Sequence, residues 1–190
     1  QSFTFPKFTS FKLGTLNRHC LFQYIKLKSI NFNFLVIVVI NCKNLTFKVS
    51  FFSKSKENGV DGVIIVDLPP EEGVELNKAC VKYGLSNVPL VAPTSSDKRI
   101  AALADMATTF LYCVSVTGVT GARSELPPDL DDYIKRVRKA TDLPLAVGFG
   151  ISSPEMVNGV ANMADGVVVG SSILNAMKDL GDDATTDEKA

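Results

Sequence analysis

The feature that most constrains the fold is a regular alternation of short apolar runs and helical periods over the second part of the chain. The runs are four to six residues long, too short for a typical helix, and most are followed by Gly, Pro or Asp. Such runs are typical of strands buried on both faces. The pattern predicts strands at 62–66, 88–92, 109–114, 144–147 and 166–169, and helices at 71–83, 96–107, 128–140, 154–162 and 171–180. Five successive strand-helix units predict an α/β fold with parallel strands and right-handed crossovers.

The position of the glycines decides between two folds that share this alternation. Doubly wound sheets and (β/α)8 barrels both give it, but the last two units here end in glycine turns, at 148–150 and at Gly170. Phosphate sites after strands seven and eight are a recurrent barrel arrangement. We therefore predict a partial (β/α)8 TIM barrel comprising strands four to eight, which would leave two unpaired strand edges and favour low solubility or dimerisation.

The chain also consists of two chemically different pieces. Residues 1–57 hold nine Lys or Arg against one acid, Glu57, whereas the remainder holds eleven bases against 19 acids, so a formal net charge of zero conceals about +8 and about −8. We predict an atypical basic Phe/Lys/Asn-rich segment at 1–56 that is unrelated to the barrel, the partial barrel at 57–180, and an acidic tail at 181–190. Because the barrel piece has no strongly basic face, no nucleic-acid partner is expected.

The first segment allows competing interpretations. Its uncharged window, 29–42, falls short of the ~20 residues that span a bilayer, so no membrane span is expected, although an interfacial segment or an organelle transit peptide stays open. Our preferred hypothesis is that most of residues 1 to about 55 is not an evolved part of this domain. The low solubility or dimerisation expected from the unpaired edges would be avoided if the apolar run 34–40 supplies a replacement strand. The four widely spaced Cys predict neither a zinc site nor a disulfide framework, which indicates a reducing compartment. We expect a cytoplasmic location and leave an organelle open.

Four motifs carry a resemblance to the tryptophan synthase alpha subunit family, over residues 57 to about 180. They are GVDGVIIVDLPPEE at 59–72, GVTGA at 118–122, VGFGISSPE at 147–155 and GVVVGSS at 166–172. The string RSELPPDL at 123–130 is more similar to fused fungal-type enzymes than to bacterial ones. The resemblance implies a lyase of tryptophan biosynthesis that cleaves indole-3-glycerol phosphate to indole and glyceraldehyde 3-phosphate by a retro-aldol reaction.

The resemblance also implies a partner and a division of the chemistry. Indole would pass to a β subunit or fused β domain, which would hold pyridoxal phosphate, so neither a cofactor nor a metal is expected in this chain. The cleavage needs carboxylates that move protons at the indole ring and at the glycerol hydroxyl. In the family these are a Glu and an Asp on the early strands, yet residues 1–56 contain no Asp or Glu. No catalytic residue is therefore expected here.

The residues that match the family's substrate site lie around the glycine turns. Phe149, Gly150, Ile151, Gly170 and Ser171 match its phosphate site, where amides at a helix N-terminus accept a dianion. The alternative is that the glycines only permit tight turns and that Ser171 is a plain N-cap. Tyr112 matches a substrate-site residue, and a core tyrosine is the alternative.

Two loops complete the expected site. The stretch 115–127 is longer than usual and matches the family's lid, with Gly118 and Thr120 in the lid and Gly121 at the substrate; a surface loop is the alternative. Val116 stands where the family commonly has Arg. Asp67, Pro69 and Pro70 match the loop that contacts the β subunit, although Asp67 could equally be a turn former.

Two functions from different classes follow. The first is an alpha-type lyase whose catalytic pair is missing from this sequence. The second is a catalytically dead half-barrel that retains only phosphate-ligand or β-subunit binding.

Overall fold

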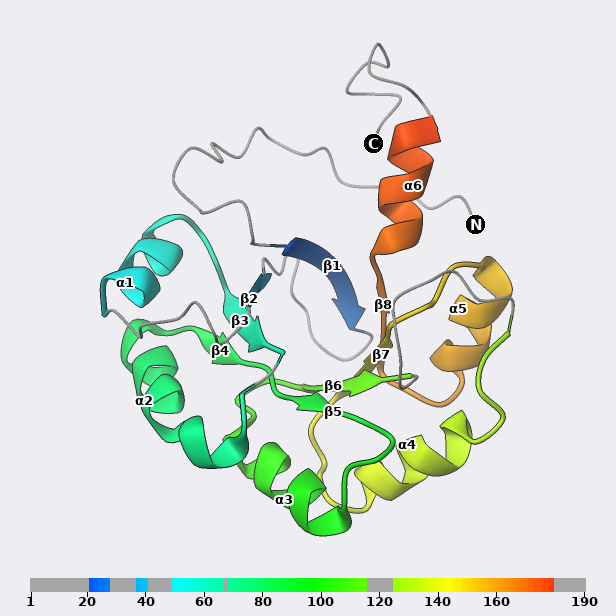
Figure 1. Cartoon of the computed structure of the whole chain (residues 1–190), viewed down its shortest axis with the longest axis horizontal. Helices are drawn as coiled ribbons and strands as arrows, with labels where there is room; N and C mark the ends of the chain where they lie inside the picture. Colours follow the sequence, from blue (N-terminus) through cyan, green and yellow to red (C-terminus); the bar gives the residue numbers. More distant parts are fainter. Residues whose placement is uncertain (1–20, 28–36, 41–48, 67, 116–124, 180–190) are drawn as a thin grey trace.

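The computed structural model describes residues 21–27, 37–40, 49–66, 68–115 and 125–179. The elements run β1 (Leu21–Leu27), β2 (Ile37–Ile40), α1 (Val49–Glu57), β3 (Gly62–Ile65), η2 (Pro70–Glu72), α2 (Val74–Tyr83), β4 (Ser86–Asn87), β5 (Leu90–Val91), α3 (Asp97–Met106), β6 (Leu111–Val114), α4 (Leu130–Arg138), β7 (Leu145–Gly148), α5 (Pro154–Ala161), β8 (Gly166–Val169) and α6 (Ser171–Asp179). The helices α1 to α5 lie along the left, lower and right sides of the group of strands in Figure 1. No helix in these ranges is both long and apolar enough to cross a membrane.

The strands pair into one eight-stranded sheet in the order β4-β3-β2-β1-β8-β7-β6-β5. From β5 to β8 all neighbours are parallel, as are β2, β3 and β4, which confirms the parallel α/β prediction for the second part of the chain. β4 and β5 belong to one extended stretch, 86–91, that pairs with β3 through its first half and with β6 through its second. The pairing therefore runs round a closed ring.

The N-terminal strands close this ring. β2 lies parallel to β3, and β1 pairs antiparallel with both β2 and β8. The replacement strand from the run 34–40 is thus present as β2, whereas β1 has no counterpart in the sequence prediction. Because both expected free edges are paired, the structure gives no support to edge-driven dimerisation.

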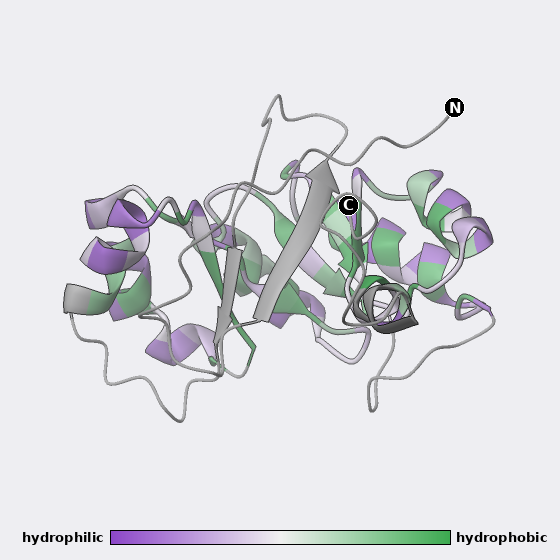
Figure 2. Cartoon of the chain, turned by 90° about the horizontal axis from the view of Figure 1, so that it is seen from above, coloured by the Kyte–Doolittle hydropathy of each residue, from purple (hydrophilic) through white to green (hydrophobic). Residues whose placement is uncertain are grey.

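Alternate residues of the strands face opposite sides of the ring. Inward-facing residues form one buried cluster, Ile64, Val88, Phe110, Tyr112, Ala146 and Val168. Their neighbours in sequence, such as Leu111, Cys113, Leu145 and Val147, face outward against the helices. In Figure 2 the apolar strands lie between helices that carry most of the hydrophilic residues. Because side chains alternate between the two faces of a pleated strand, each apolar run contributes residues to a core inside the ring and to a core between the ring and the helices.

The helices begin and end where local chemistry predicts. Ser96 and Ser153 cap α3 and α5 through side-chain oxygens that accept from the Arg99 and Met156 amides. Gly84 ends α2 in the left-handed conformation, at φ 62°. In α4 the buried residues recur at helical spacing and pack on the sheet; they are Leu130, Tyr133, Ile134 and Val137.

Helix α1 crosses the predicted boundary at residues 56 and 57. Phe52 on this helix is 1% exposed and shares a core with Val60, Leu76 and Cys80. Its ring stacks on Tyr83 at a centroid distance of 6.5 Å, and Lys56 Nζ donates to the Gly84 carbonyl at 3.1 Å. The change in composition therefore does not coincide with a break in packing.

An ion pair between Arg138, the last residue of α4, and Asp165, which precedes β8, links this helix to the strand ring. Asp165 accepts hydrogen bonds from the Arg138 guanidinium and, at 2.8 Å, from the Leu145 amide. Burial opposes ionisation of Asp165, but these two donors outweigh it, so the pKa of this carboxyl lies below its ordinary value. A group with a lowered pKa stabilises the fold above its ordinary pKa and loses that contribution as the pH falls through the folded value.

We expect Asp165→Asn to lower the free energy of unfolding by about 1 kcal/mol at pH 7, a modest figure because both side chains are about one-third exposed. The difference from the wild-type chain should shrink when urea unfolding is repeated near pH 3. Asp131→Asn, which breaks the more exposed Lys135 pair, is the control and should change stability by less than about 0.5 kcal/mol. A pH-independent deficit in Asp165→Asn would contradict the charge-based account.

Candidate functional site

The predicted site residues fall partly within the described ranges. Asp67, Gly118, Thr120 and Gly121 lie outside them, as does Val116. Of the others, the structure places seven beyond the carboxyl ends of the parallel strands: Phe149, Gly150, Ile151, Gly170, Ser171, Pro69 and Pro70. Tyr112 lies within β6, two residues before its carboxyl end. In parallel β/α folds this is the end where ligands bind.

The turn after β7 is held by Ser115, the residue that directly follows β6. The Ser115 amide donates to the Gly148 carbonyl at 2.8 Å, and Ser115 Oγ donates to the Phe149 carbonyl. Ser115 is only 3% exposed, so water does not compete strongly for these bonds. One buried serine therefore fixes two successive peptide groups of the turn.

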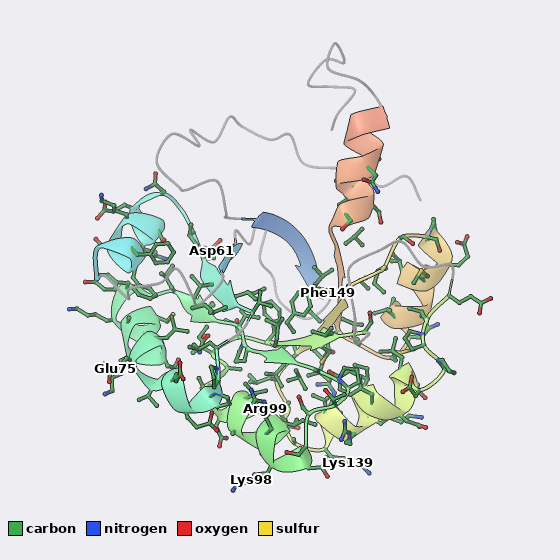
Figure 3. The ribbon with its side chains drawn as sticks, in the orientation of Figure 1. Asp61, Glu75, Lys98, Arg99, Lys139 and Phe149 are labelled. Atoms are coloured by element: carbon green, nitrogen blue, oxygen red, sulfur yellow. The ribbon has the colours of Figure 1, made fainter. Side chains whose placement is uncertain are left out.

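The backbone of this turn has an uncommon conformation. Phe149 and Gly150 both have positive φ, at 76° and 75°. A residue with a Cβ at such a φ costs about 1–2 kcal/mol, and Phe149 is the only described non-glycine residue with it. Phe149 lies near the centre of the strand ring, whereas the labelled Glu75, Lys98 and Lys139 lie outside the ring, on or beside the helices at the periphery of the molecule (Figure 3). Phe149 thus combines a strained backbone with a position inside the strand ring.

A hydrogen bond connects the turn after β8 to the turn after β7. Ser172 Oγ donates to the Ile151 carbonyl at 3.1 Å, across 21 residues of sequence. The Ile173 amide donates to the Gly170 carbonyl at 3.0 Å, in the first turn of α6. The two glycine turns, with the starts of α5 and α6, therefore form one joined structure.

The electrostatics of this structure suit an anion held by backbone amides. The segments 145–155 and 166–176 contain no Lys or Arg, and their one acid is Glu155. Glu155 lies in the first turn of α5, where its carboxylate accepts hydrogen bonds from its own backbone amide and from the Ser153 hydroxyl, and these lower its pKa. A helix N-terminus favours negative charge in this way because its amides point outward and its dipole is positive there.

Tyr112 lies beneath the turn rather than on an open surface. It is 2% exposed, and its ring meets that of Phe149 edge to face at a centroid distance of 6.0 Å. Burial raises the pKa of its hydroxyl well above the usual range. Tyr112 is therefore a neutral residue whose aromatic ring packs directly under the turn.

Pro69 and Pro70 follow β3 at the same end of the ring. Pro70 is buried and begins η2, while Pro69 is half-buried. A methyl group at the following Gly73 would meet Met106 Cε at 2.1 Å, so this loop packs closely on the end of α3. Of the two prolines, Pro69 presents more surface to a partner.

The cysteines in the described part of the chain are poor nucleophiles. Cys80 and Cys113 are free and buried, and burial raises the pKa of both thiols to about 12. Within the described ranges, no three His, Cys, Asp or Glu residues gather into a metal site.

Ser172 is a site residue that the motifs do not single out individually, and Ser115 enters the sequence prediction only as the first residue of the lid stretch. The signal that could have found them is a serine directly after a predicted strand end, at Ser115, or beside a glycine turn, at Ser172. The partners of both serines are far away in sequence, which hid their roles.

Comparison with known proteins agrees with this arrangement. The family model described as tryptophan synthase alpha chain matches residues 15–190, which includes most of the segment predicted to be unrelated. The tryptophan synthase alpha chain of Carboxydothermus hydrogenoformans is 44% identical over 128 residues, covering 67% of this chain and 48% of the relative. That of Roseiflexus castenholzii is 52% identical over 120 residues, covering 63% and 46%. This chain thus spans about half the length of the curated relatives it matches.

Solved structures give the same result. A structure described as that of the tryptophan synthase a2b2 complex of the hyperthermophile Pyrococcus furiosus aligns with a TM-score of 0.70 and 32% identity, covering 82% of this chain and 62% of the other. Mycobacterium tuberculosis tryptophan synthase aligns with a TM-score of 0.68 and 32% identity, covering 75% and 55%. These neighbours are alpha-chain barrels, in keeping with the α/β ring described above. The chain belongs to the tryptophan synthase alpha chain family.

Proposed function

We propose that this chain carries the substrate-holding part of an alpha-type lyase that cleaves indole-3-glycerol phosphate to indole and glyceraldehyde 3-phosphate. The observation that carries the proposal is the joined pair of glycine turns at the ends of β7 and β8, bonded through Ser172 and Ile151. Amides at these turns and at the starts of α5 and α6 would donate hydrogen bonds to the phosphate, with Phe149, Gly150, Ile151, Gly170 and Ser171 around it. Gly121, with Gly118 and Thr120 in the lid, would close the site.

The apolar interior supports binding of the aromatic part of the substrate. Tyr112 and Phe149 meet edge to face inside the ring, beside Ala146 and Val168. An indole ring buried against such a surface gains both from the loss of apolar area to water and from aromatic contact. The phosphate and the indole of one molecule could thus be held by the same turn and the cluster beneath it.

Proton transfer is the part of the chemistry that these residues do not supply. Breaking the carbon-carbon bond requires carboxylates at the ring and at the glycerol hydroxyl. Strands β1 and β2, which occupy the ring positions beside β8 and β3, have the sequences LFQYIKL and IVVI and contain no acid. We infer that the sequence as given holds the substrate without cleaving it.

The test measures binding and turnover separately on the full chain. Calorimetry with glycerol 3-phosphate should show binding, while indole release from indole-3-glycerol phosphate should stay at background, with or without an added tryptophan synthase β subunit. Indole release above background would show that another carboxylate transfers the proton, Asp67 or Glu57 being the first to replace by the amide. Absence of glycerol phosphate binding would overturn the holding role itself.

A β-subunit partner is a second proposed function, supported by the similarity to the Pyrococcus furiosus complex. The contact would involve Asp67, Pro69 and Pro70, at the loop after β3. Pyridoxal phosphate would belong to that partner and not to this chain. Gel filtration with a β subunit should show a complex that Pro69→Asp weakens, and co-elution unchanged by this variant would argue against the proposed contact.

A further inference from the structure

Two serine hydroxyls hold the carbonyls on either side of Gly150. Ser115 Oγ donates to the Phe149 carbonyl, and Ser172 Oγ donates to the Ile151 carbonyl at 3.1 Å. We propose that Ser115 and Ser172 are positioning residues, which orient the backbone of the phosphate-binding turn without touching the phosphate. This inference rests on the proposed function, because it concerns the same site.

The orientation follows from peptide geometry. Among the described residues there are no cis peptide bonds, so the carbonyl of Phe149 and the N–H of Gly150 point in opposite directions across one planar group. A Phe149 carbonyl bound to Ser115, the residue after β6, therefore directs the Gly150 N–H away from Ser115. The hydroxyl thus selects the direction in which this donor faces.

The turn needs such a constraint because the backbone alone does not fix this peptide group. Rotating the peptide group between Phe149 and Gly150 changes ψ of Phe149 and φ of Gly150 and would reverse the Gly150 N–H, and glycine tolerates either sign of φ. Ser115 opposes the rotation from a fixed position, because it is 3% exposed and its own amide donates to the Gly148 carbonyl at 2.8 Å. A donor that already faces the ligand avoids the cost of reorganisation on binding.

Ser172 acts on the other side of Gly150. By bonding the Ile151 carbonyl, it holds the beginning of the α5 loop against the first turn of α6. The turns after β7 and β8 are thereby held in a fixed position relative to each other. Because Ser172 is half-buried, its hydroxyl competes with water more than that of Ser115 does, and its contribution should be smaller.

The experiment replaces each serine by alanine and measures the dissociation constant for glycerol 3-phosphate by calorimetry. Ser115→Ala should weaken binding by about tenfold and Ser172→Ala by about threefold. The matched control is Ser95→Ala, which removes a hydroxyl of similar burial in the loop after β5, where it accepts from the Ala92 amide at 3.2 Å. The control should lose stability but keep wild-type affinity.

A spectroscopic measurement separates positioning from general destabilisation. In the wild-type chain the Gly150 amide resonance should shift on adding glycerol 3-phosphate, and in Ser115→Ala this shift should be lost while the variant still unfolds cooperatively. Unchanged affinity in both serine variants, or an equal loss in Ser95→Ala, would overturn the inference and leave the proposed function intact. If Ser115→Ala does not fold, Ser172→Ala decides on the same criteria. No binding by the wild-type chain would overturn both.

Discussion

Phe52→Ala is expected to lower the free energy of unfolding by about 4 kcal/mol, because it empties a buried aromatic site. The Phe52 ring is 1% exposed, stacks on Tyr83 with an interplanar angle of 12°, and meets Phe51 edge to face at 5.4 Å. The cavity would lie between α1 and α2, which are also linked by the hydrogen bond from Lys56 Nζ to the Gly84 carbonyl. These contacts leave little freedom for the helices to collapse into the space.

Urea unfolding followed by circular dichroism measures this loss. The control is Phe51→Ala on the same helix, which should cost about 1–2 kcal/mol because Phe51 is only half-buried. A small effect at Phe52 would show that α1 does not pack on the ring in solution, and the folded unit would then begin near residue 57, as the composition suggests. The experiment therefore decides between the composition boundary and the packing boundary.

Gly148→Ala should cost about 3 kcal/mol, at the upper end of the overpacking range. A Cβ at this position would lie 2.2 Å from Tyr112 Oη and 2.8 Å from both Tyr112 Cζ and Val168 Cβ. Val168 Cβ is fixed by its own strand, so the new methyl group cannot be accommodated by a side-chain rotation. Either the strand or the Tyr112 ring must move.

A double-mutant cycle with Tyr112→Phe checks this cause. Removing the hydroxyl should recover part of the loss in Gly148→Ala, and the remainder reflects the ring Cζ, which phenylalanine keeps, together with Val168. Gly159→Ala in α5 is the control: its Cβ would meet the end of a flexible side chain, Leu126 Cδ1, at 2.7 Å, and alanine favours the helix by about 1 kcal/mol. Equal losses at Gly148 and Gly159 would contradict the steric account.

Local pattern was enough to predict the secondary structure after residue 58. The run GVVV was predicted as a strand over the same residues that form β8, and the helix predicted at 128–140 is α4, Leu130–Arg138. These predictions succeed because side-chain period, serine caps and glycine turns act within a few residues. One strand was predicted at 88–92 where the structure has β4 and β5 on either side of Val88 and Pro89, because proline cannot donate to a ladder.

The sequence identified which residues form the candidate site, but not the contacts that bring them together. The glycine turns were identified from sequence, but the bond from Ser115 to Phe149 spans 34 residues and that from Ser172 to Ile151 spans 21. Tyr112 matched a substrate residue by motif, and only packing placed it under the turn at 2% exposure. Contacts of this range depend on which strands become neighbours, which no local pattern specifies.

The sequence by itself therefore determined the parallel β/α units and the chemistry of their turns, since both follow from residues close together in the chain. Only the tertiary structure decided how the sheet closes, with β2 parallel to β3 and β1 antiparallel to β8. The physical reason is that an unpaired strand edge offers backbone donors and acceptors to any extended segment that can reach it, whatever the charge of that segment. A basic, Phe-rich composition marked residues 1–56 as different, but it carried no information about which edges those residues would pair.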